Sequence, residues 1–268
     1  MIDVKIVADS KSYDDIRLIT YELTYPRYIH SEFMTHRVFS RNASSSRAIP
    51  IKKVIEEVTT NPVIPVEWGK NQKGMQAREQ LSIEDSPKAT KIWLDAASAA
   101  ASFATALETL GVHKQITNRI LEPFINIKVI CTATEYQNFF KLRAHPDAQP
   151  EIRMLAEKML EVYKLSQPVK LKSDQYHIPY VSAEEINNYK IETLIKCSIA
   201  RCARVSYKNH DGTNPIIDKD IELYEKLLES RHLSPFEHVA KPDSLEWHAN
   251  LYGWKSIRRT IPGEYIPR

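Results

Sequence analysis

The residues best suited to chemistry stand close together in residues 36–47, which read H-R-V-F-S-R-N-A-S-S-S-R. This stretch holds three arginines and four serines beside His36 and Asn42, and it contains neither an acid nor a glycine. The planar guanidinium of arginine binds phosphate through parallel hydrogen bonds, and serine hydroxyls and loop N–H groups can bind the remaining oxygens. The stretch therefore predicts an anion site, although a solvated basic loop or an RNA-contacting patch would have the same composition.

The composition is that of an ordinary globular protein. The chain has 268 residues, 43% hydrophobic and 26% charged, which predicts a single soluble domain over residues 1–268. The net charge of +3 is too small to indicate nucleic-acid binding by itself. No signal peptide is visible, and the longest apolar-leaning run, residues 96–107, is too short to span a bilayer, so we expect no membrane contact and a cytoplasmic protein.

The cysteines and histidines do not form a pattern that would bind a metal. The three cysteines include no C-x-x-C pair, and the sequence has no H-E-x-x-H motif. We therefore expect no metal site and no disulfide framework.

The segments before the basic stretch predict the elements that hold it. Residues 4–8 and 16–25 are rich in β-branched and apolar side chains, which predicts two strands. Residues 27–35 contain no helix breaker and predict a short helix that leads into the basic stretch. The chain would then leave this helix as a loop, which would place the serines and Arg47 at the mouth of a site.

Most of the later chain predicts helices. Residues 51–85 read as turns with one short helix near Val54, suited to a lid or an interface arm. An alanine-rich helix follows, with Ser86 as its cap and Gly111 as its stop. Small side chains let another helix approach closely, but alanine also favours helix by itself. Further helices are predicted over residues 113–140 (interrupted near Pro123), 150–165, 184–204 and 217–228. Residues 208–215 read as a loop, and the aromatic and basic tail, residues 244–268, has no predicted element.

The spacing of the basic stretch, His-Arg-x-x-Ser-x-Asn-x-x-Ser-x-Arg, resembles the signature of the flavin-dependent thymidylate synthases. The resemblance implies that one set of residues binds the nucleotide: Glu32, Ser45, Ser46 and Arg47. It implies that another set binds FAD: His36, Arg37 and Val38.

Further segments resemble the same family. Residues 138–152 read N-F-F-K-L-R-A-H-P-D-A-Q-P-E-I, in which the resemblance assigns Asn138 to the flavin and Arg143 to the pyrimidine ring. In N-R-I-L-E-P, Arg119 matches an arginine that binds nucleotide from another subunit. The segments A-R-V-S and R-H-L-S-P-F-E-H supply four more implied flavin contacts: Ser206, His232, Ser234 and Glu237.

The resemblance implies an α+β fold, a small mixed or antiparallel sheet flanked by long helices, in a homotetramer with shared active sites. It implies methylation of dUMP at C5 to dTMP, with methylenetetrahydrofolate as carbon donor and NADPH-reduced FAD as hydride source. Arg143 and Ser45 are the catalytic candidates. This route needs no enzyme nucleophile, and the cysteines lie in apolar contexts that read as helical, so we expect them to be inert: Cys131, Cys197 and Cys202.

The order of the segments differs from that of the family. There the S-P-F-E-H segment precedes the basic signature, whereas here residues 234–238 follow it by nearly the whole chain. We therefore predict a circular permutation, which is tolerated where chain termini lie close together at the surface. It requires residues 234–238 to lie beside residues 40–47, with the strand at residues 16–25 central.

Several positions depart from the family pattern: Thr35, Ala43, Ala48, Thr132 and Thr134. Changes in the nucleotide pocket leave UMP or dCMP open as substrates, and a hydroxymethyl product open as well. A different class of function also remains, a non-catalytic nucleotide- or RNA-binding relative that keeps the phosphate site.

Overall fold

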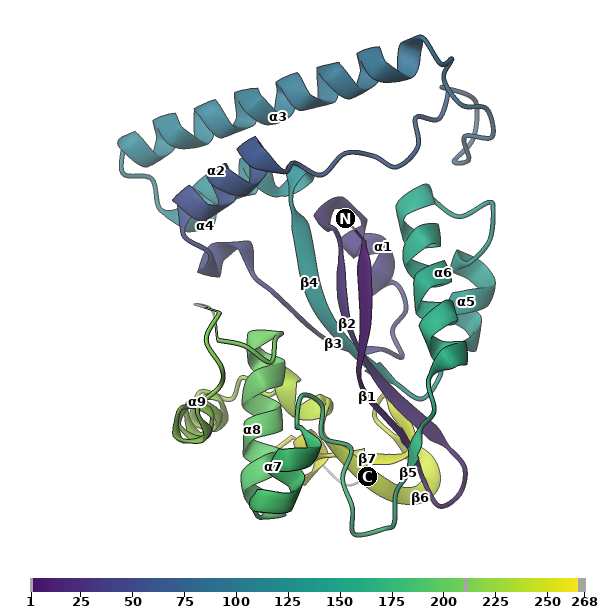
Figure 1. The fold of residues 1–268 in the computed structure, drawn as a ribbon, viewed down its shortest axis with the longest axis vertical. Coiled ribbons are helices and arrows are strands. Elements are labelled where there is room, and N and C mark those ends of the chain that lie inside the picture. Colours follow the sequence, from purple (N-terminus) through teal and green to yellow (C-terminus); the bar gives the residue numbers. More distant parts are fainter. Residues whose placement is uncertain (1, 210–211, 265–268) are drawn as a thin grey trace.

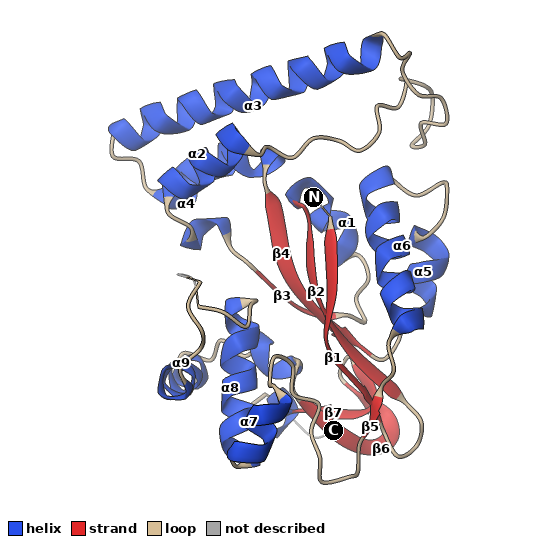
Figure 2. Ribbon diagram, viewed as in Figure 1, coloured by secondary structure: helices blue, strands red, loops and turns tan. Residues whose placement is uncertain are grey.

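The structure, a computed structural model, describes residues 2–209 and 212–264, and within them a mixed five-stranded sheet forms the centre (Figures 1 and 2). The strands are β1 (Asp3–Lys11), β2 (Arg17–Pro26), β3 (Ser40–Ala43), β4 (Asn126–Ala133) and β5 (Val169–Lys170). Their order is β3-β4-β2-β1-β5, and every pair is antiparallel except β1 with β5. The predicted α+β class with a small mixed sheet is confirmed.

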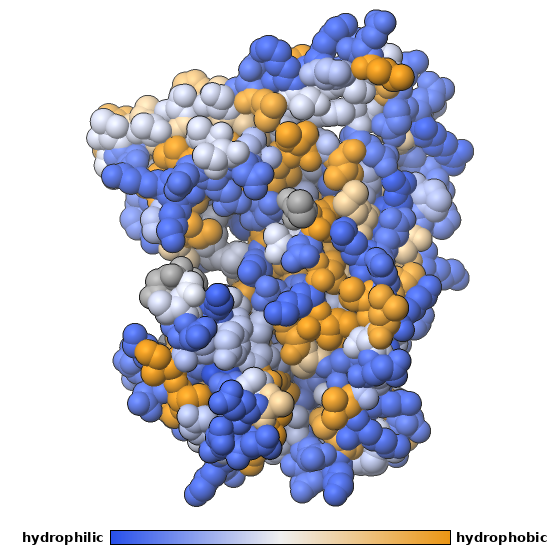
Figure 3. All heavy atoms as spheres, viewed as in Figure 1, coloured by the Kyte–Doolittle hydropathy of each residue, from blue (hydrophilic) through white to orange (hydrophobic). Residues whose placement is uncertain are grey.

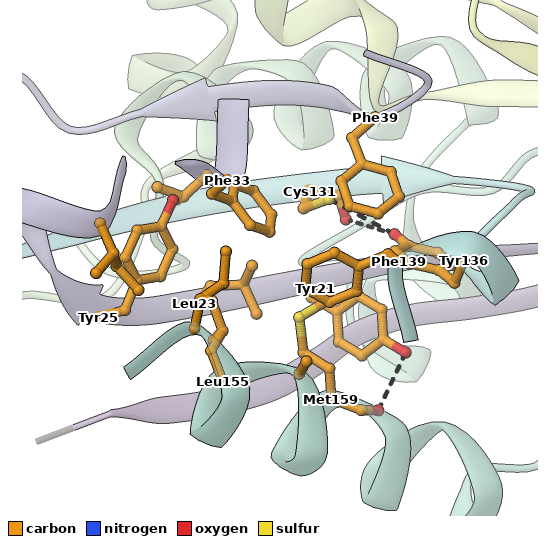
Figure 4. Packing of buried hydrophobic residues seen from close by; sticks show 14 of the residues in the cluster. Tyr21, Leu23, Tyr25, Phe33, Phe39, Cys131, Tyr136, Phe139, Leu155 and Met159 are labelled. Atoms are coloured by element: carbon orange, nitrogen blue, oxygen red, sulfur yellow. Dashed lines mark hydrogen bonds between the residues drawn. The ribbon is translucent and has the colours of Figure 1, made fainter. Parts of the chain in front are cut away.

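Helices cover one face of the sheet. They are α1 (His30–Met34), α5 (Gln137–Arg143) and α6 (Pro150–Leu165). Figure 4 shows Tyr21 and Leu23 of β2 packed between Phe33 above and Leu155 and Met159 of α6 below, and all five side chains are fully buried. In α6, apolar residues recur at the helical spacing of 152, 155, 159 and 162, a pattern that predicts a core-facing stripe. Burial of each such side chain contributes roughly 1.5–3 kcal/mol. On the face shown in Figure 3, apolar side chains gather over β1 and α6.

The C-terminal part of the chain covers the other face. It contains α7 (Ala183–Asn188), α8 (Ile191–Arg204), α9 (Ile217–Glu229), β6 (Ala240–His248) and β7 (Leu251–Ser256). Strands alternate their side chains between the two faces. Leu18 of β2 accordingly packs against Trp254 of β7, while its neighbour Ile19 belongs to the opposite core. We predicted no element in the aromatic tail. Its first part belongs to a hairpin of β6 and β7, in which Trp254 is fully buried against the sheet.

Helices α2 (Ile51–Thr60), α3 (Asp85–Thr109) and α4 (Lys114–Thr117) stand at one end of the sheet, with a small core of their own (Figure 1). The helix near Val54 and the stop at Gly111, whose φ is +79°, are confirmed. The predicted cap at Ser86 was wrong. Helix α3 already begins at Asp85, and the side chain that binds the Asp85 N–H is Ser82, at 3.0 Å.

The prediction of helix over residues 113–140 was wrong at its centre, where β4 lies. Helix α4, the 3-10 helix η3 (Asn118–Phe124) and α5 are helical, but Asn126–Ala133 pairs with β2 on one side and β3 on the other. A strand buried on both faces is apolar throughout and lacks the alternation that reveals a strand in sequence. Cys131 therefore lies in a strand, whereas Cys197 and Cys202 lie in α8 as predicted.

Candidate functional site

The basic stretch runs along the edge of the sheet instead of forming a loop throughout. Residues 40–43 are strand β3, which pairs with β4 so that Ser40 lies opposite Thr132 and Asn42 opposite Ile130. A turn from α1 precedes the strand, and the 3-10 helix η2 (Ser46–Ala48) follows it. The prediction that the chain leaves the short helix as a loop was therefore wrong over β3. The two ends of the basic stretch contact different parts of the fold.

At the first end, Arg143 of α5 binds His36. The Arg143 Nε donates to His36 Nε2 at 3.0 Å, and Nη2 reaches Thr35 Oγ1 at 3.5 Å. The His36 ring packs edge-on against Phe139, with a centroid distance of 4.9 Å. Burial, together with the charges of Arg143 and Arg41, lowers the pKa of His36 to about 4. At neutral pH His36 is therefore an uncharged acceptor, and its single proton lies on Nδ1.

The three arginines of the stretch have different roles. Arg41 Nη1 donates to the carbonyl oxygens of Phe33, Met34 and His36 at 3.0–3.2 Å, so Arg41 closes the end of α1. Arg37 and Arg47 have exposed side chains and no hydrogen-bond or ion-pair partner within the described ranges. These two remain open to an anionic ligand, whereas Arg41 is structural.

Asn42, in the middle of the stretch, joins it to the C-terminal part of the chain. Its Nδ2 donates to the Cys202 carbonyl at the end of α8 at 2.9 Å, and its Oδ1 accepts from Ser234 Oγ at 3.2 Å. Ser234 begins the 3-10 helix η4 (Ser234–Glu237). Residues 234–238 thus lie beside the basic stretch and β2 is central, as the permutation requires; the permutation itself stays a prediction.

A buried chain of hydrogen bonds ties the same region to the sheet. It runs from Ser10 through His177, Thr20 and Thr132 to His238, with distances of 2.8, 2.7, 2.7 and 2.8 Å. Burial lowers the pKa of both histidines to about 3, so both are neutral. Each hydroxyl has one hydrogen to give, so all the bonds must point the same way along the chain. Sequence patterns did not reveal this chain, since its members are far apart.

At the second end, Glu122 of η3 collects the polar groups. Ser46 is buried, and its Oγ donates to Glu122 Oε1 at 2.6 Å. The same oxygen accepts from Arg119 Nη1 at 3.0 Å and forms an ion pair with Arg27 Nη2 at 3.1 Å. Burial alone would raise the pKa of Glu122, but the Ser46 hydroxyl and the two arginines lower it overall. Sequence reasoning missed Glu122, although it stands in the segment that supplied Arg119.

The remaining predicted residues are dispersed around these contacts. Glu32 and Ser45 are half-buried; Val38, Asn138 and His232 are exposed. The Ser206 hydroxyl accepts the Lys208 N–H at 3.2 Å, and Glu237 pairs with Arg258 at 2.7 Å. The structure therefore brings together His36 with Arg143, Ser46 with Arg119, and the signature strand with Ser234. No contact joins Arg143 to Ser46 or Arg47 in the part of the chain that the structure describes.

The fit of FAD to the implied residues is partial. Arg37, Val38 and Asn138 present exposed side chains that can receive an aromatic, anionic group. Thr132 cannot receive such a group, because its side chain is fully buried and its hydroxyl belongs to the buried chain of hydrogen bonds. The Thr134 hydroxyl already accepts the Tyr252 N–H at 3.2 Å. A flavin would therefore be held from the turn between α1 and β3 and from the start of α5.

The cysteines are not built for nucleophilic chemistry. All three are buried and free. Burial raises the pKa of the Cys131 thiol to about 12 and that of Cys197 to about 11, and it raises that of Cys202 as well. Within the described residues, no group of three or more histidines, cysteines or acids is arranged to hold a metal, and no helix has the length and apolarity needed to cross a membrane.

The fold and the site define an α+β protein with an acid-free cationic cluster at one end of an edge strand and a carboxylate-bridged cluster at the other. The sequence model of the thymidylate synthase complementing protein family matches residues 16–169, and the chain belongs to this family. The matched part contains the whole basic stretch, Arg119 and Arg143, and it ends before residues 231–238. The family is generally flavin-dependent.

Among solved structures, one with a TM-score above 0.5 shows the same fold. It is a UMP/dUMP methylase, PolB, from Streptomyces cacaoi bound with 5-Br dUMP: its identity to this chain is 17% and its TM-score 0.51, with 62% of this chain and 90% of that one covered. Another structure of that methylase, bound with 5-Br UMP, has 18% identity and a TM-score of 0.48, with 62% and 89% covered. No curated protein matches the chain.

Proposed function

We propose that this protein is a flavin-dependent pyrimidine C5 methyltransferase that converts dUMP to dTMP. Methylenetetrahydrofolate would donate the carbon, and FAD reduced by NADPH would supply the hydride. The observation that carries the proposal is the bond between Arg143 and neutral His36, in a family member whose signature leaves Arg37 and Arg47 open. The name of the PolB structure, a UMP/dUMP methylase with this fold, supports the same substrate class.

Arg143 has the position and charge to act on the pyrimidine ring. Its side chain is half-buried, and it has no acid partner among the residues described. A cation that no carboxylate neutralises can stabilise the negative charge on a ring carbonyl in the enolate form of the pyrimidine, the form in which C5 is nucleophilic. His36 accepts from Arg143 without adding charge, and so fixes the direction of the guanidinium.

The phosphate would be held where the signature ends. Arg47 is exposed and unpaired within the described ranges, and the half-buried Ser45 begins the turn that contains it. A charged donor and neighbouring hydroxyls form the strong, charge-assisted bonds that phosphate requires. Ser45 would thus position the nucleotide, with Arg143 at its ring.

The chain would hold FAD through its exposed residues and supply no nucleophile of its own. Arg37, Val38, Asn138 and His232 are the accessible members of the implied set. FAD, when bound, would supply the redox chemistry of the reaction. The buried cysteines, whose thiols have raised pKa values, do not compete with this route.

Further copies of the chain would complete the assembly, a homotetramer. One face of α3 packs against α2, but the other is apolar and exposed: Ile92 is 69%, Phe103 66% and Leu110 79% exposed. These side chains adjoin a shallow groove of about 570 Å³ lined by alanines. Phe103→Asp should shift the mass in solution toward the monomer, measured by light scattering, whereas the charge-conserving variant Glu108→Asp should not.

The test of the activity supplies FAD, NADPH and methylenetetrahydrofolate with dUMP, UMP or dCMP in turn, and identifies the product by mass. We expect dTMP from dUMP, and a purified protein with the yellow colour of flavin. Faster turnover of UMP or dCMP, or a product heavier by one oxygen, would assign another substrate or product to the same chemistry. A colourless protein that binds nucleotide but no added FAD would instead indicate a non-catalytic binder.

A further inference from the structure

The contacts of Glu122 resemble those that a bound phosphate would make. Within the described residues its Oε1 accepts from Ser46 Oγ at 2.6 Å and from Arg119 Nη1 at 3.0 Å, and it forms an ion pair with Arg27 Nη2 at 3.1 Å. Two guanidinium groups and a serine hydroxyl are the donors that proteins use for phosphate. Here all of them converge on one carboxylate oxygen.

This cluster borders a cavity that a ligand could enter. The cavity has a volume of about 350 Å³ and is lined by Arg27, Arg119 and Glu122 together with His30 and Ser31. The Arg27 side chain is 18% exposed, that of Glu122 22% and that of Arg119 51%. The arginines are therefore partly shielded from water but reachable from the cavity, which favours binding of an anion.

We propose that the Glu122 carboxylate, which binds Ser46 between Ser45 and Arg47, occupies part of the phosphate position at the end of the signature in the ligand-free protein, and that the incoming phosphate monoester displaces it. The inference rests on the proposed function, because it takes the ligand to be a nucleotide. It identifies Glu122 as a residue that sets the specificity of the site, through competition with the ligand for the same donors.

The exchange is physically reasonable because phosphate matches the donors better than a carboxylate does. A phosphate monoester has three terminal oxygens and nearly two negative charges at neutral pH. It can give Ser46, Arg27 and Arg119 an oxygen each, where Glu122 makes them share one. The displaced carboxylate can turn toward water, since Glu122 is at the cavity wall and its Oε2 has no hydrogen-bond partner among the described residues.

Competition of this kind discriminates among anions: it favours a dianionic phosphate over more weakly charged groups. A nucleoside without phosphate gains nothing at the cluster and leaves Glu122 in place. A dianionic phosphate that displaces Glu122 pairs with both Arg27 and Arg119. While Glu122 is in place, the cluster has a net charge of +1, counted as two arginines less one carboxylate. Glu122 therefore lowers the affinity of every anion but penalises weakly charged ones most.

The test compares the binding of inorganic phosphate, dUMP and deoxyuridine to the wild-type protein and to Glu122→Gln by calorimetry. Glutamine keeps the size of the side chain and its acceptor oxygen but removes the competing charge. We expect the affinity for phosphate and dUMP to rise about tenfold and that for deoxyuridine to stay unchanged. Glu56→Gln, at an exposed site on α2, is the matched control and should change none of the three affinities.

Unchanged or weaker phosphate binding in a folded Glu122→Gln protein would overturn the proposal and make Glu122 a structural partner of Arg27. A second measurement does not depend on the variant: the carboxylate ¹³C signal of Glu122 in the wild-type protein. It should move toward the value of a solvated carboxylate when phosphate is added. A signal that stays in place at saturating phosphate would overturn the proposal as well.

The two proposals can fail separately. If no nucleotide is methylated but Glu122→Gln gains phosphate affinity, the proposed activity is wrong and the competition by Glu122 stands. If the wild-type protein makes dTMP and Glu122→Gln binds phosphate no more tightly, the activity stands and the role of Glu122 is wrong.

Discussion

The two ends of the basic stretch use the same residue types but reach opposite electrostatic states. At the His36 end, Arg143 binds a neutral ring and has no acid partner within the described residues. At the Ser46 end, Arg119 and Arg27 share the carboxylate of Glu122. Strand β3, residues 40–43, lies between the two ends in the chain. An arginine near a signature is therefore an open anion site only when the fold brings no acid to it.

This difference predicts how binding energy is distributed over the ligand. A guanidinium that already has a carboxylate must give up that bond to bind a phosphate, so its net contribution is small. A guanidinium that faces a neutral acceptor keeps its full charge for the ligand. We therefore expect the His36 end to contribute most of the affinity and the Ser46 end to contribute selectivity.

The largest expected effect is that of Arg143→Ala. A charge-assisted bond contributes roughly 1.5–3 kcal/mol, so nucleotide affinity should fall about tenfold to a hundredfold, and turnover should fall further if Arg143 also stabilises charge on the ring. Calorimetry and steady-state kinetics measure the two effects. The neighbouring exposed variant Lys141→Ala is the control. Equal losses in both variants would show that general positive charge, rather than the His36 contact, attracts the nucleotide.

Two further substitutions compare an open with a neutralised arginine. Arg47 is unpaired among the described residues, so Arg47→Ala should weaken nucleotide binding about tenfold while FAD binding changes little. Arg119 shares Glu122, so Arg119→Ala should cost only a few-fold. Calorimetric titrations with dUMP measure both. A larger loss for Arg119 than for Arg47 would contradict the contrast between an open and a neutralised arginine.

The two ends should also respond differently to acid. His36 is partly buried with a pKa lowered to about 4, so the unfolded chain takes up this proton first, and the stability contributed by His36 declines as pH falls from about 6.5 toward 4. Water screens the site, so the effect should stay below about 1 kcal/mol. NMR titration should place the His36 midpoint below the ordinary histidine value and, in Arg143→Ala, at a higher pH than in the wild-type protein. A midpoint at the ordinary histidine value in the wild-type protein would refute the described environment.

The smallest expected effect on activity is that of removing the cysteines. Cys131, Cys197 and Cys202 are buried, and none contacts either end through its side chain in the described structure. Replacing all three by Ala should lower the free energy of unfolding, because cavities form, but leave turnover per folded molecule unchanged. Turnover measured on a folded, flavin-loaded triple variant decides this. Its loss would require a covalent cysteine mechanism.

Local sequence patterns predicted much of the framework. The apolar stripe of Ile152, Leu155, Met159 and Val162 repeats at helical spacing and was predicted to be core; the first three side chains are fully buried, and Val162 is partly buried against them. The strands before the signature were recognised from their β-branched residues. Strand β4 was missed because both of its faces are buried, which removes the alternation that distinguishes a strand from a buried helix.

The sequence by itself determined which residues could bind an anion and how they are spaced, since residue type and local periodicity depend only on near neighbours. Tertiary structure decided which of them stay available. Glu122 reaches Ser46 across 76 positions, and His238 reaches Thr132 across 106. No local pattern encodes such contacts, because the sheet and η3 create them only when the chain has folded. The charge of the site is therefore a property of the fold, whereas its donors are a property of the sequence.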